Sequence, residues 1–432
     1  MEEPRNSPIC NSIDRISNLP ENLIHHIMFF MDMTYVVQTC VLSKRWKHLW
    51  TNTPNLNFDF NVYSLGIDNR QYFGLPSHYF IKFVDQVFIL RDNSNIQKVN
   101  LVCGVESNPF IGISAMTASL TTWIVAAVRR NIQEFYLDIS AVKISRFPQC
   151  LFTCTSLIKL ELKLGGNSSI IVLPTSMDLP RLTFMKLDSL LSTDVNLTNR
   201  LFLKLDFVSK TSSKVKIDAP NLVSFKCRDY VSKCYVLENL ASLVTADINV
   251  GATKEEAAKI KDYAKNNWLL TSALSSVKEL RLTEAFLCIC KICSSVSAKV
   301  SLQFSNLRFV KLETFLSRNV IRALGWLFYM SPNIESLAVV ITGMPKSDIP
   351  DNEDYWAGVS PDHLRSVEIR GLTGHFNNEL KFVEILFKKA VILENMVLFS
   401  CKKSMTDKRL ITFREKLPTL PRASSNVATF LI

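Results

Sequence analysis

Three cysteines are the strongest candidates for metal chemistry in this sequence. Cys288, Cys290 and Cys293 lie close together, and thiolates at such spacing bind zinc when a fourth ligand completes a tetrahedron. No second cysteine pair and no histidine lies nearby. The apolar neighbours Phe286 and Ile289 indicate a buried helix instead, so we expect no metal site.

The other reactive residue types form no catalytic pattern. The histidines occur at positions 25, 26, 48, 78, 363 and 375. They lack the spacing of a metalloprotease, and the sequence has no nucleophile-elbow, Walker or dinucleotide-binding motif. We therefore expect no active site and no cofactor, and we predict that the chain is not an enzyme.

The composition is that of a globular protein. The chain has 432 residues, of which 47% are hydrophobic and 21% charged, and this length favours two or more domains. The net charge of +11 is scattered through the chain, which favours solubility over a nucleic-acid partner. Residues 1–20 lack the apolar core of a secretory signal. We expect a protein that is not secreted, in the nucleus or the cytoplasm, with free thiols.

One uncharged stretch, residues 107–128, has the length of a membrane span. Polar residues interrupt it, and its apolar residues recur every three or four positions, as on one face of a soluble helix. That stripe comprises Ile113, Met116, Leu120, Trp123, Ile124 and Ala127. We predict a helix packed on a core and no membrane partner.

Three short helices are predicted near the N-terminus, after a polar segment, residues 1–13, that we expect to be disordered. Ser17 and Asn18 are candidate caps for the first helix, and Pro20 suits its first turn. Asp32 and Thr34 can start the second helix, and Ser43 can cap the third. The apolar residues of the three helices are Leu23, Ile24, Ile27, Phe30, Met31, Val36, Val37, Cys40, Val41, Trp46, Leu49 and Trp50. So short a bundle cannot bury them all, which indicates a partner surface.

These residues carry a resemblance to a known motif. The segments 14–23 and 41–50 resemble the two ends of a plant-type F-box, with which family members bind a Skp-type adaptor that docks on a cullin scaffold. The resemblance implies an F-box over residues 14–60. The implied adaptor-binding residues are Leu19, Pro20, Leu23, Ile24, Ile27, Val37, Val41, Leu42, Ser43 and Trp46. The link Met31-Asp32-Met33-Thr34 departs from the family pattern, which puts the second helix and the adaptor affinity in doubt.

An apolar pattern at i, i+3 and i+5 recurs from about residue 96. The triplets are 96/99/101, 132/135/137, 157/160/162, 182/185/187, 202/205/207, 222/225/227, 243/246/248, 277/280/282, 307/310/312, 334/337/339, 364/367/369 and 393/396/398. Many successive triplets lie 25 to 30 residues apart, near the period of leucine-rich repeats. The pattern predicts an α/β leucine-rich-repeat solenoid, or horseshoe, over residues 61–345, with ordinary βαβ units as the alternative. A charge run at residues 254–265 predicts a solvated helix.

The last part of the chain, residues 355–432, resembles the FBD domain that often closes plant F-box/leucine-rich-repeat proteins. The resemblance rests on residues 363–398, including Leu364, Gly371 and Glu379. The pattern predicts a strand, a glycine turn, an amphipathic helix with Leu380, Val383 and Phe387 on one face, and a returning strand. We expect an α+β cap for the solenoid.

In each predicted repeat, the residue between the last two apolar positions points away from the core, because side chains alternate along a strand. Read in order, these residues are Tyr136, Glu161, Lys186, Asp206, Lys226, Asp247, Arg281, Lys311, Ala338 and Glu368. The mixture of signs favours a protein target over nucleic acid. The candidate target-binding residues are Tyr136, Glu161, Lys186, Lys226, Arg281 and Lys311, although a solvated face without a partner is the alternative.

The resemblance implies the substrate-recognition subunit of an SCF-type (Skp–cullin–F-box) ubiquitin ligase. Such a subunit joins a cullin-RING ligase through the adaptor and binds a protein target through its repeats. Two alternatives share the architecture: a ligand-sensing receptor, and a repeat scaffold that does not direct ubiquitination. A deep polar pocket would favour the ligand-sensing receptor.

Overall fold

The computed structural model shows helices and parallel strands in two compact units. Unit 1 comprises residues 1–166 and 178–181, and unit 2 comprises residues 167–177 and 182–432. The described residues are 16, 18–65, 76–103, 113–139, 147–164, 170–171, 174, 177–188, 190–191, 195–196, 202–206, 214–230, 234–252, 259–296, 303–343, 355–373, 377–400 and 408–432. The segment 1–13, for which we expected disorder, lies outside them.

Unit 1 begins with the three expected helices. They are α1 (Glu21–Phe29), α2 (Met33–Gln38) and α3 (Trp46–Leu49), with 3-10 turns η1 (Thr39–Val41) and η2 (Trp50–Asn52). The cap prediction for α1 was wrong, because its N-cap is Pro20, which makes no side-chain cap bond. Asp32 caps α2 as expected by accepting a bond from the Thr34 amide. The second helix therefore forms despite the unusual link.

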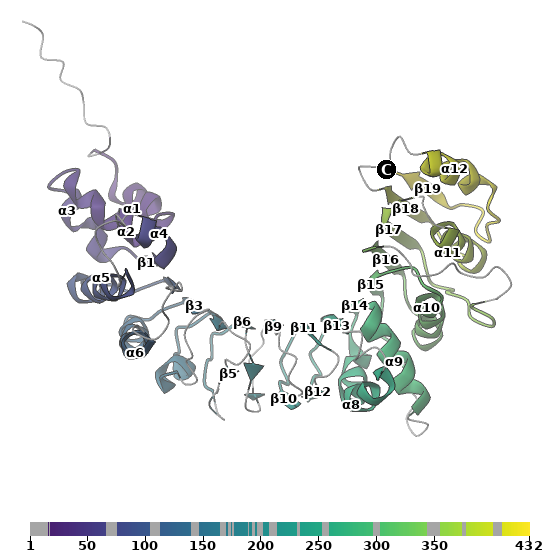
Figure 1. Cartoon of the computed structure of the whole chain (residues 1–432), viewed down its shortest axis with the longest axis horizontal. Helices are drawn as coiled ribbons and strands as arrows, with labels where there is room; N and C mark the ends of the chain where they lie inside the picture. The colour runs from purple at the N-terminus through teal and green to yellow at the C-terminus, as the bar shows by residue number, and fades with distance from the viewer. Residues whose placement is uncertain are drawn as a thin grey trace, which may run out of the picture. The chain divides into compact units, whose positions relative to one another are not determined.

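Four parallel strands follow in unit 1, and each is hydrogen-bonded to the next. They are β1 (Asn55–Asp59), β2 (Lys98–Val102), β3 (Glu134–Ile139) and β4 (Lys159–Leu164). Between them lie α4 (Phe60–Leu65), α5 (Pro76–Leu90), α6 (Ile113–Arg129) and the 3-10 turn η3 (Gln149–Thr153). In α6, Met116, Leu120, Trp123, Ile124 and Ala127 are buried, which confirms these members of the predicted apolar stripe, while the side chain of Ile113 lies outside the described part. In Figure 1, α5 and α6 lie side by side, and they pack on each other.

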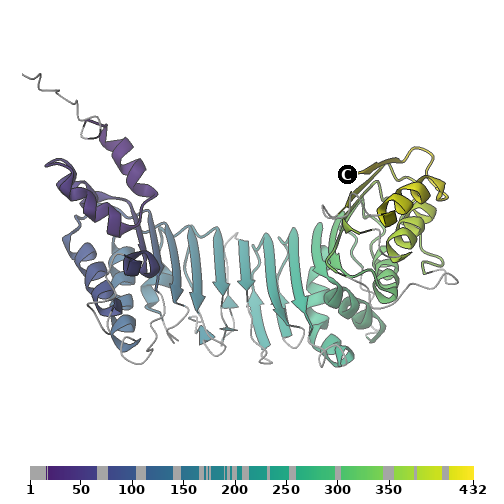
Figure 2. The ribbon, with the colours of Figure 1, turned by 45° about the horizontal axis from the view of Figure 1, so that its top comes forward.

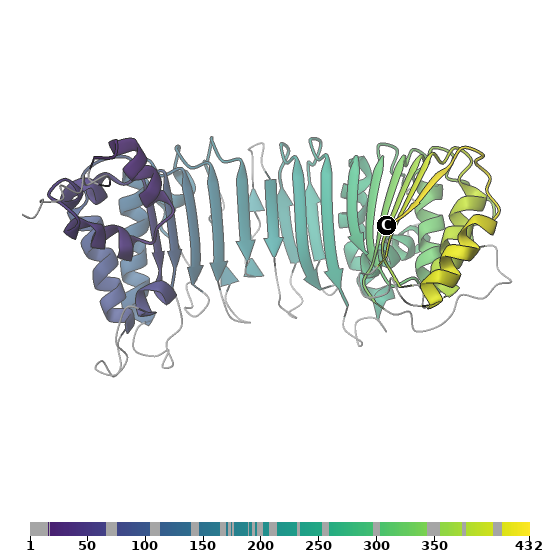
Figure 3. The ribbon, with the colours of Figure 1, turned by 90° about the horizontal axis from the view of Figure 1, so that it is seen from above.

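Unit 2 continues the parallel pattern, and Figure 2 shows the arrowheads of its long strands pointing the same way. The strands are β6 (Phe184–Asp188), β9 (Phe202–Asp206), β11 (Ser224–Tyr230), β13 (Thr245–Gly251), β14 (Glu279–Thr283), β15 (Phe309–Thr314), β16 (Ser336–Ile341), β17 (Ser366–Leu372), β18 (Asn395–Ser400) and β19 (Ala428–Leu431). Each is bonded to the next in that order. Figure 3 shows them running side by side.

A second layer in unit 2 explains the irregular repeat period. Where the repeats are short, the return path is a strand: β8 (Val195–Asn196), β10 (Lys214–Asp218) and β12 (Cys234–Glu238) form a separate sheet, and β5 (Ile170–Ile171) pairs with β7 (Leu190–Leu191). Longer repeats carry α8 (Ile260–Ala273), η4 (Leu274–Ser276), α9 (Glu284–Val296), α10 (Arg318–Met330), α11 (Asn377–Lys389), α12 (Lys408–Lys416) and η5 (Leu417–Thr419). The charged helix expected at 254–265 occupies 260–273, and residues 254–258 lie outside the described part.

The apolar triplets form the buried ladder beneath the strands, with one exception. Leu160, Val310 and Leu312 are fully buried, like the residues of the other confirmed triplets. The triplet 202/205/207 was wrong, because Phe202 is 53% exposed and the ladder position is taken by Leu203. Parallel pairing sets Leu203 beside Met185 and Leu205 beside Leu187. Lys204, not Asp206, is therefore the residue between the two ladder positions.

The residues that resemble an FBD domain prolong the same parallel sheet. The strand β17 leads through Gly371 to α11, and β18 then pairs parallel to β17. Gly371 lies inside β17, where the register with β18 shifts, and not in the turn that the sequence predicted. Its φ is +83°, and a Cβ there would lie 2.5 Å from the Ile341 carbonyl oxygen, so this position requires glycine. The predicted helix face shifts slightly: Phe382, Val383, Leu386 and Phe387 are buried, while Leu380 is half-buried.

Candidate protein-interaction surfaces

The N-terminal helices leave large apolar side chains uncovered. On α1, Ile24 and Met28 are buried, whereas Leu23 and Ile27 remain 46% and 45% exposed. Phe30, one helical turn further along, is 73% exposed. Apolar side chains clustered at helical spacing on a surface mark a site for a partner.

A second apolar site follows α2, where η1 ends. Val41 is 83% and Leu42 53% exposed. Among the other expected adaptor-binding residues, Pro20 is exposed, and Leu19, Val37 and Ser43 are half-buried. Ile24 and Trp46 are buried, because their side chains point into the helix bundle, so their part in a surface would be indirect.

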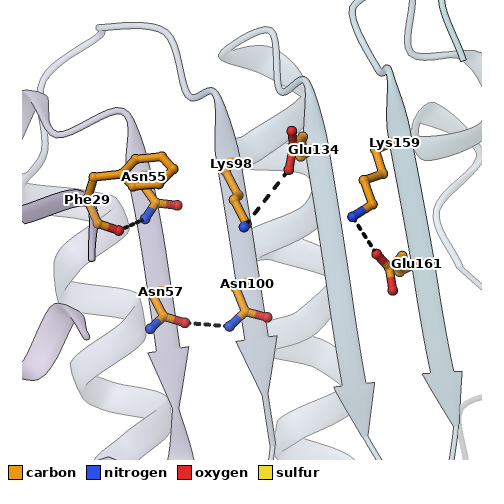
Figure 4. Close-up of polar contacts among 8 residues, drawn as sticks. All are labelled: Phe29, Asn55, Asn57, Lys98, Asn100, Glu134, Lys159 and Glu161. Carbon is orange, nitrogen blue, oxygen red and sulfur yellow. Dashed lines mark hydrogen bonds and ion pairs between the residues drawn. The ribbon is translucent and has the colours of Figure 1, made fainter. Parts of the chain in front are cut away.

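Polar bonds hold these helices on β1. The buried carboxylate of Asp32 accepts a hydrogen bond from the backbone amide of Thr34 at 2.8 Å. Its other oxygen accepts one from the backbone amide of Asp59, also at 2.8 Å. Burial raises the pKa of Asp32 above its usual value. Asn55 Nδ2 donates to the Phe29 carbonyl oxygen at 2.5 Å, and Figure 4 shows this bond at the start of β1.

The polar face of unit 1 is the side of β1 to β4 that alternates with the buried ladder. Its charged side chains meet partners of opposite sign, as in the pair Lys159 Nζ–Glu161 Oε1 at 2.7 Å. Lys98 lies 4.0 Å from Glu134 on the next strand, and Asn100 donates to Asn57 (Figure 4). All of these residues except Asn57 border a surface depression that Tyr136 also lines.

The polar face of unit 2 is the corresponding side of its long strands. The predicted target-binding residues Lys186, Lys226, Arg281 and Lys311 lie at equivalent positions on β6, β11, β14 and β15. Tyr136 and Glu161 occupy the same position on the strands of unit 1. A surface depression in unit 2 is bordered by Lys226, Asp247, Arg281 and Lys311, together with neighbouring polar residues.

Two cysteines of the α9 cluster, Cys290 and Cys293, lie in the core, and Cys288 is half-buried. Cys293 donates its thiol to the Ala264 carbonyl oxygen at 2.9 Å, and Thr271 lies 3.8 Å from the Cys290 sulfur. Burial raises the pKa of Cys288 and of Cys293 to about 11, so both remain protonated thiols at neutral pH, and zinc binds thiolates. Within the described residues, no cluster of three or more His, Cys, Asp or Glu could hold a metal ion.

A comparison with protein families accounts for the N-terminal helices. The F-box domain model matches residues 16–58, which span α1 to most of β1. The chain carries an F-box domain at its N-terminus. The match includes every exposed residue described above on α1 and η1, together with Asp32 and Asn55.

Relatives extend the likeness over most of the chain. A putative F-box/LRR-repeat protein of Arabidopsis thaliana is 25% identical over 96% of this chain and 98% of its own length. A putative F-box/FBD/LRR-repeat protein of the same plant is 22% identical over 98% of this chain and 94% of its length. A third relative, a putative F-box/LRR-repeat protein, reaches 31% identity over 41% of this chain and 35% of its length. These comparisons agree with the repeat ladder of the structure.

Three features of these surfaces escaped the sequence interpretation. Tyr35, 47% exposed on α2, was not among the expected adaptor-binding residues. Lys204 was missing from the predicted outward-facing residues, because the wrong triplet put Asp206 in its place. The bond from Asn55 to α1 had no sequence signal, because it joins a side chain to a backbone carbonyl group. In the described part of the chain, no helix is both long and apolar enough to cross a bilayer.

Proposed function

We propose that the chain is the substrate-recognition subunit of an SCF-type E3 ubiquitin ligase. The observation that carries this proposal is the set of exposed apolar side chains on the F-box, above all Leu23, Ile27 and Val41. They would bury against a Skp-type adaptor, which links the chain to a cullin-RING ligase. The ubiquitin-transfer chemistry would belong to the other subunits.

In this proposal the chain has three working parts. Residues 14–60 bind the adaptor, residues 61–345 form the repeats that select a target protein, and residues 355–432 close the repeats. The target would contact the polar faces of the sheet, where side chains can vary without disturbing the ladder. The ligand-sensing alternative has less support, because polar groups at the unit 1 depression already bond to one another, as Lys159 does with Glu161.

The adaptor interaction can be tested with purified full-length chain and a recombinant Skp-type adaptor. The triple variant Leu23→Ala, Ile27→Ala and Val41→Ala should weaken binding by about tenfold or more, because each truncation removes buried apolar area at an interface. The matched control is Leu65→Ala, Ile89→Ala and Leu90→Ala, which truncates three apolar residues outside the F-box that are at least as exposed. Binding unchanged in the first variant would refute the proposal.

A second variant examines the helix start. Leu19→Ala with Pro20→Ala should weaken adaptor binding less than the triple variant, because Leu19 is only partly exposed. Its folding is checked by far-ultraviolet circular dichroism before binding is measured.

A further inference from the structure

The register of unit 2 lines up basic side chains on neighbouring strands. Lys186 lies beside Lys204, and Lys204 beside Lys226. Beyond Asp247, Arg281 lies beside Lys311. We name the five basic residues Lys186, Lys204, Lys226, Arg281 and Lys311 the basic row. Asp247 is the one acidic residue among these six positions, and it is already bound to Lys226 Nζ at 2.5 Å.

Within the basic row, Arg281 and Lys311 give the strongest indication of a binding partner. They occupy directly paired positions on β14 and β15, where like charges destabilise a sheet. Among the residues that the structure describes, neither forms an ion pair with a carboxylate. In contrast, Lys163 on the polar face of unit 1 binds Asp138 at 2.7 Å. An arrangement that costs stability in the free chain is relieved when an anion binds between the two cations.

The surface around these two residues suits a carboxylate. They border the depression of unit 2, which Asn249 and Thr283 also line. An arginine guanidinium can bind both oxygens of a carboxylate, and a lysine ammonium adds a further charged bond. Neighbouring strands lie about 4.8 Å apart, so the row from β6 to β15 is about 24 Å long. An extended peptide of about seven residues covers that distance.

The rows on either side distinguish a protein from a nucleic acid. Two residues before the basic row, the same face carries Phe184, Phe202 and Phe309. Two residues after it, Asp188 and Glu313 follow Lys186 and Lys311 on their strands. A uniformly charged phosphate backbone would meet those carboxylates, whereas a peptide can place acidic residues on the basic row and apolar residues against the phenylalanines.

We propose that the basic row binds an acidic, extended segment of the target protein, with apolar residues beside its carboxylates. This inference rests on the proposed function for its identification of the ligand as the target. The chemistry of the row itself does not depend on the adaptor.

A random peptide display library selected on the full chain supplies the probe. The selected peptides should be enriched in Asp and Glu, and the best of them, synthesised with a fluorescent label, should bind less tightly as salt is raised. The variant Lys204→Glu, Arg281→Glu and Lys311→Glu should bind that peptide at least about tenfold more weakly, and the corresponding triple substitution to arginine should retain binding.

The matched control makes the same charge change elsewhere in unit 2. Lys261→Glu, Arg414→Glu and Lys416→Glu replace three exposed basic residues on α8 and α12 and should leave peptide binding unchanged. Selected peptides without acidic enrichment, or equal binding by the two glutamate variants, would overturn the inference. A labelled single-stranded RNA that binds more tightly than the peptide and is lost in the first variant would also overturn it.

Adaptor binding is measured on the same samples. Capture of the adaptor by both glutamate variants supports separate surfaces for the two partners. If the wild-type chain fails to bind any Skp-type adaptor but binds acidic peptides through the row, the proposed function fails and the binding chemistry of the row stands.

Discussion

The polar faces of the two units both arise from the alternation of side chains along parallel strands, but their charges are arranged differently. On unit 1, opposite charges lie together, as in Lys159 with Glu161 and Lys163 with Asp138. On unit 2, Lys226 pairs with Asp247 in the same way, but Arg281 and Lys311 lie side by side without a carboxylate between them. Because neither set enters the core, the ladder tolerates both. The difference shows that a repeat sheet can pair its surface charges internally in one region and place like charges side by side in another.

In unit 1, part of strand β1 also binds the helical segment of the F-box. Asn55 and the Asp59 amide bind groups of α1 and the α1–α2 link, so the end of the sheet is occupied by the chain itself. If the two polar faces lie over the same kind of buried ladder and differ only in their charges, substitutions in the two units should have the following effects.

The largest effect should come from disrupting the buried apolar ladder, which lies beneath both polar faces. Leu160→Lys in unit 1 and Leu312→Lys in unit 2 each place a charge in a fully buried ladder position and should unfold the surrounding repeats, at a cost of several kcal/mol. Thermal unfolding followed by circular dichroism measures the loss. Glu161→Lys and Glu313→Lys, one residue along, are the controls, and a wild-type melting temperature in either leucine variant would contradict the buried ladder.

An intermediate effect should follow from removing the anchor that is particular to unit 1. Asp32→Ala leaves two amides, of Thr34 and Asp59, without their acceptor and should destabilise the F-box by about 1–3 kcal/mol. Hydrogen exchange should accelerate in α1 and α2 and remain unchanged in β14 to β16. Equal acceleration in both regions would show that the anchor is not local.

The buried charge of Asp32 gives this prediction a matched control. Its pKa is raised in the folded protein, so its ionisation opposes folding: its contribution to stability is largest below the unfolded pKa and is lost as pH rises through the folded pKa. Asp32→Asn keeps an acceptor oxygen and removes that charge. It should therefore cost less stability than Asp32→Ala at neutral pH.

The smallest effects should have opposite signs on the two faces. Glu161→Lys breaks the pair with Lys159 and should lower the free energy of unfolding, by up to about 1 kcal/mol. Lys311→Glu places an anion beside Arg281 and should raise it by a similar amount. Urea denaturation midpoints provide the measurement. Shifts in the same direction would show that the two faces do not differ in the way described.

The ladder was largely predictable because buried strand residues must be apolar and must alternate. The prediction failed at Phe202, since hydrophobicity alone cannot distinguish a ladder residue from an exposed aromatic residue that directly precedes it. Both frames preserve the alternation, so only pairing with β6 decides between them. The error was small in sequence but changed the charge pattern of the polar face from Asp206 to Lys204.

Two strands escaped the triplet pattern because a threonine replaces an apolar residue. Thr53 is fully buried ahead of Leu56 and Phe58 of β1, and its hydroxyl group donates to the Leu49 carbonyl oxygen at 3.4 Å. Thr429 occupies a ladder position beside Met396 in β19. The exposed residues of α1 could be inferred from helical spacing, whereas the contacts of Asp32 and Asn55 depend on segments that only folding brings together.

The strand β1 also limits how such proteins can be recombined. All of β1 except Asp59 lies within the stretch assigned to the F-box, yet the strand pairs along its whole length with β2. A chimera joined just before Asn55 would separate Asp32 from the Asp59 amide and the Phe29 carbonyl group from its donor. A junction just after Asp59 would remove the strand that pairs with β2, unless the recipient supplied a strand in the same register. Exchange of F-box modules between such chains should therefore succeed only when the donor's β1 is transferred together with its helices and matches the recipient's β2.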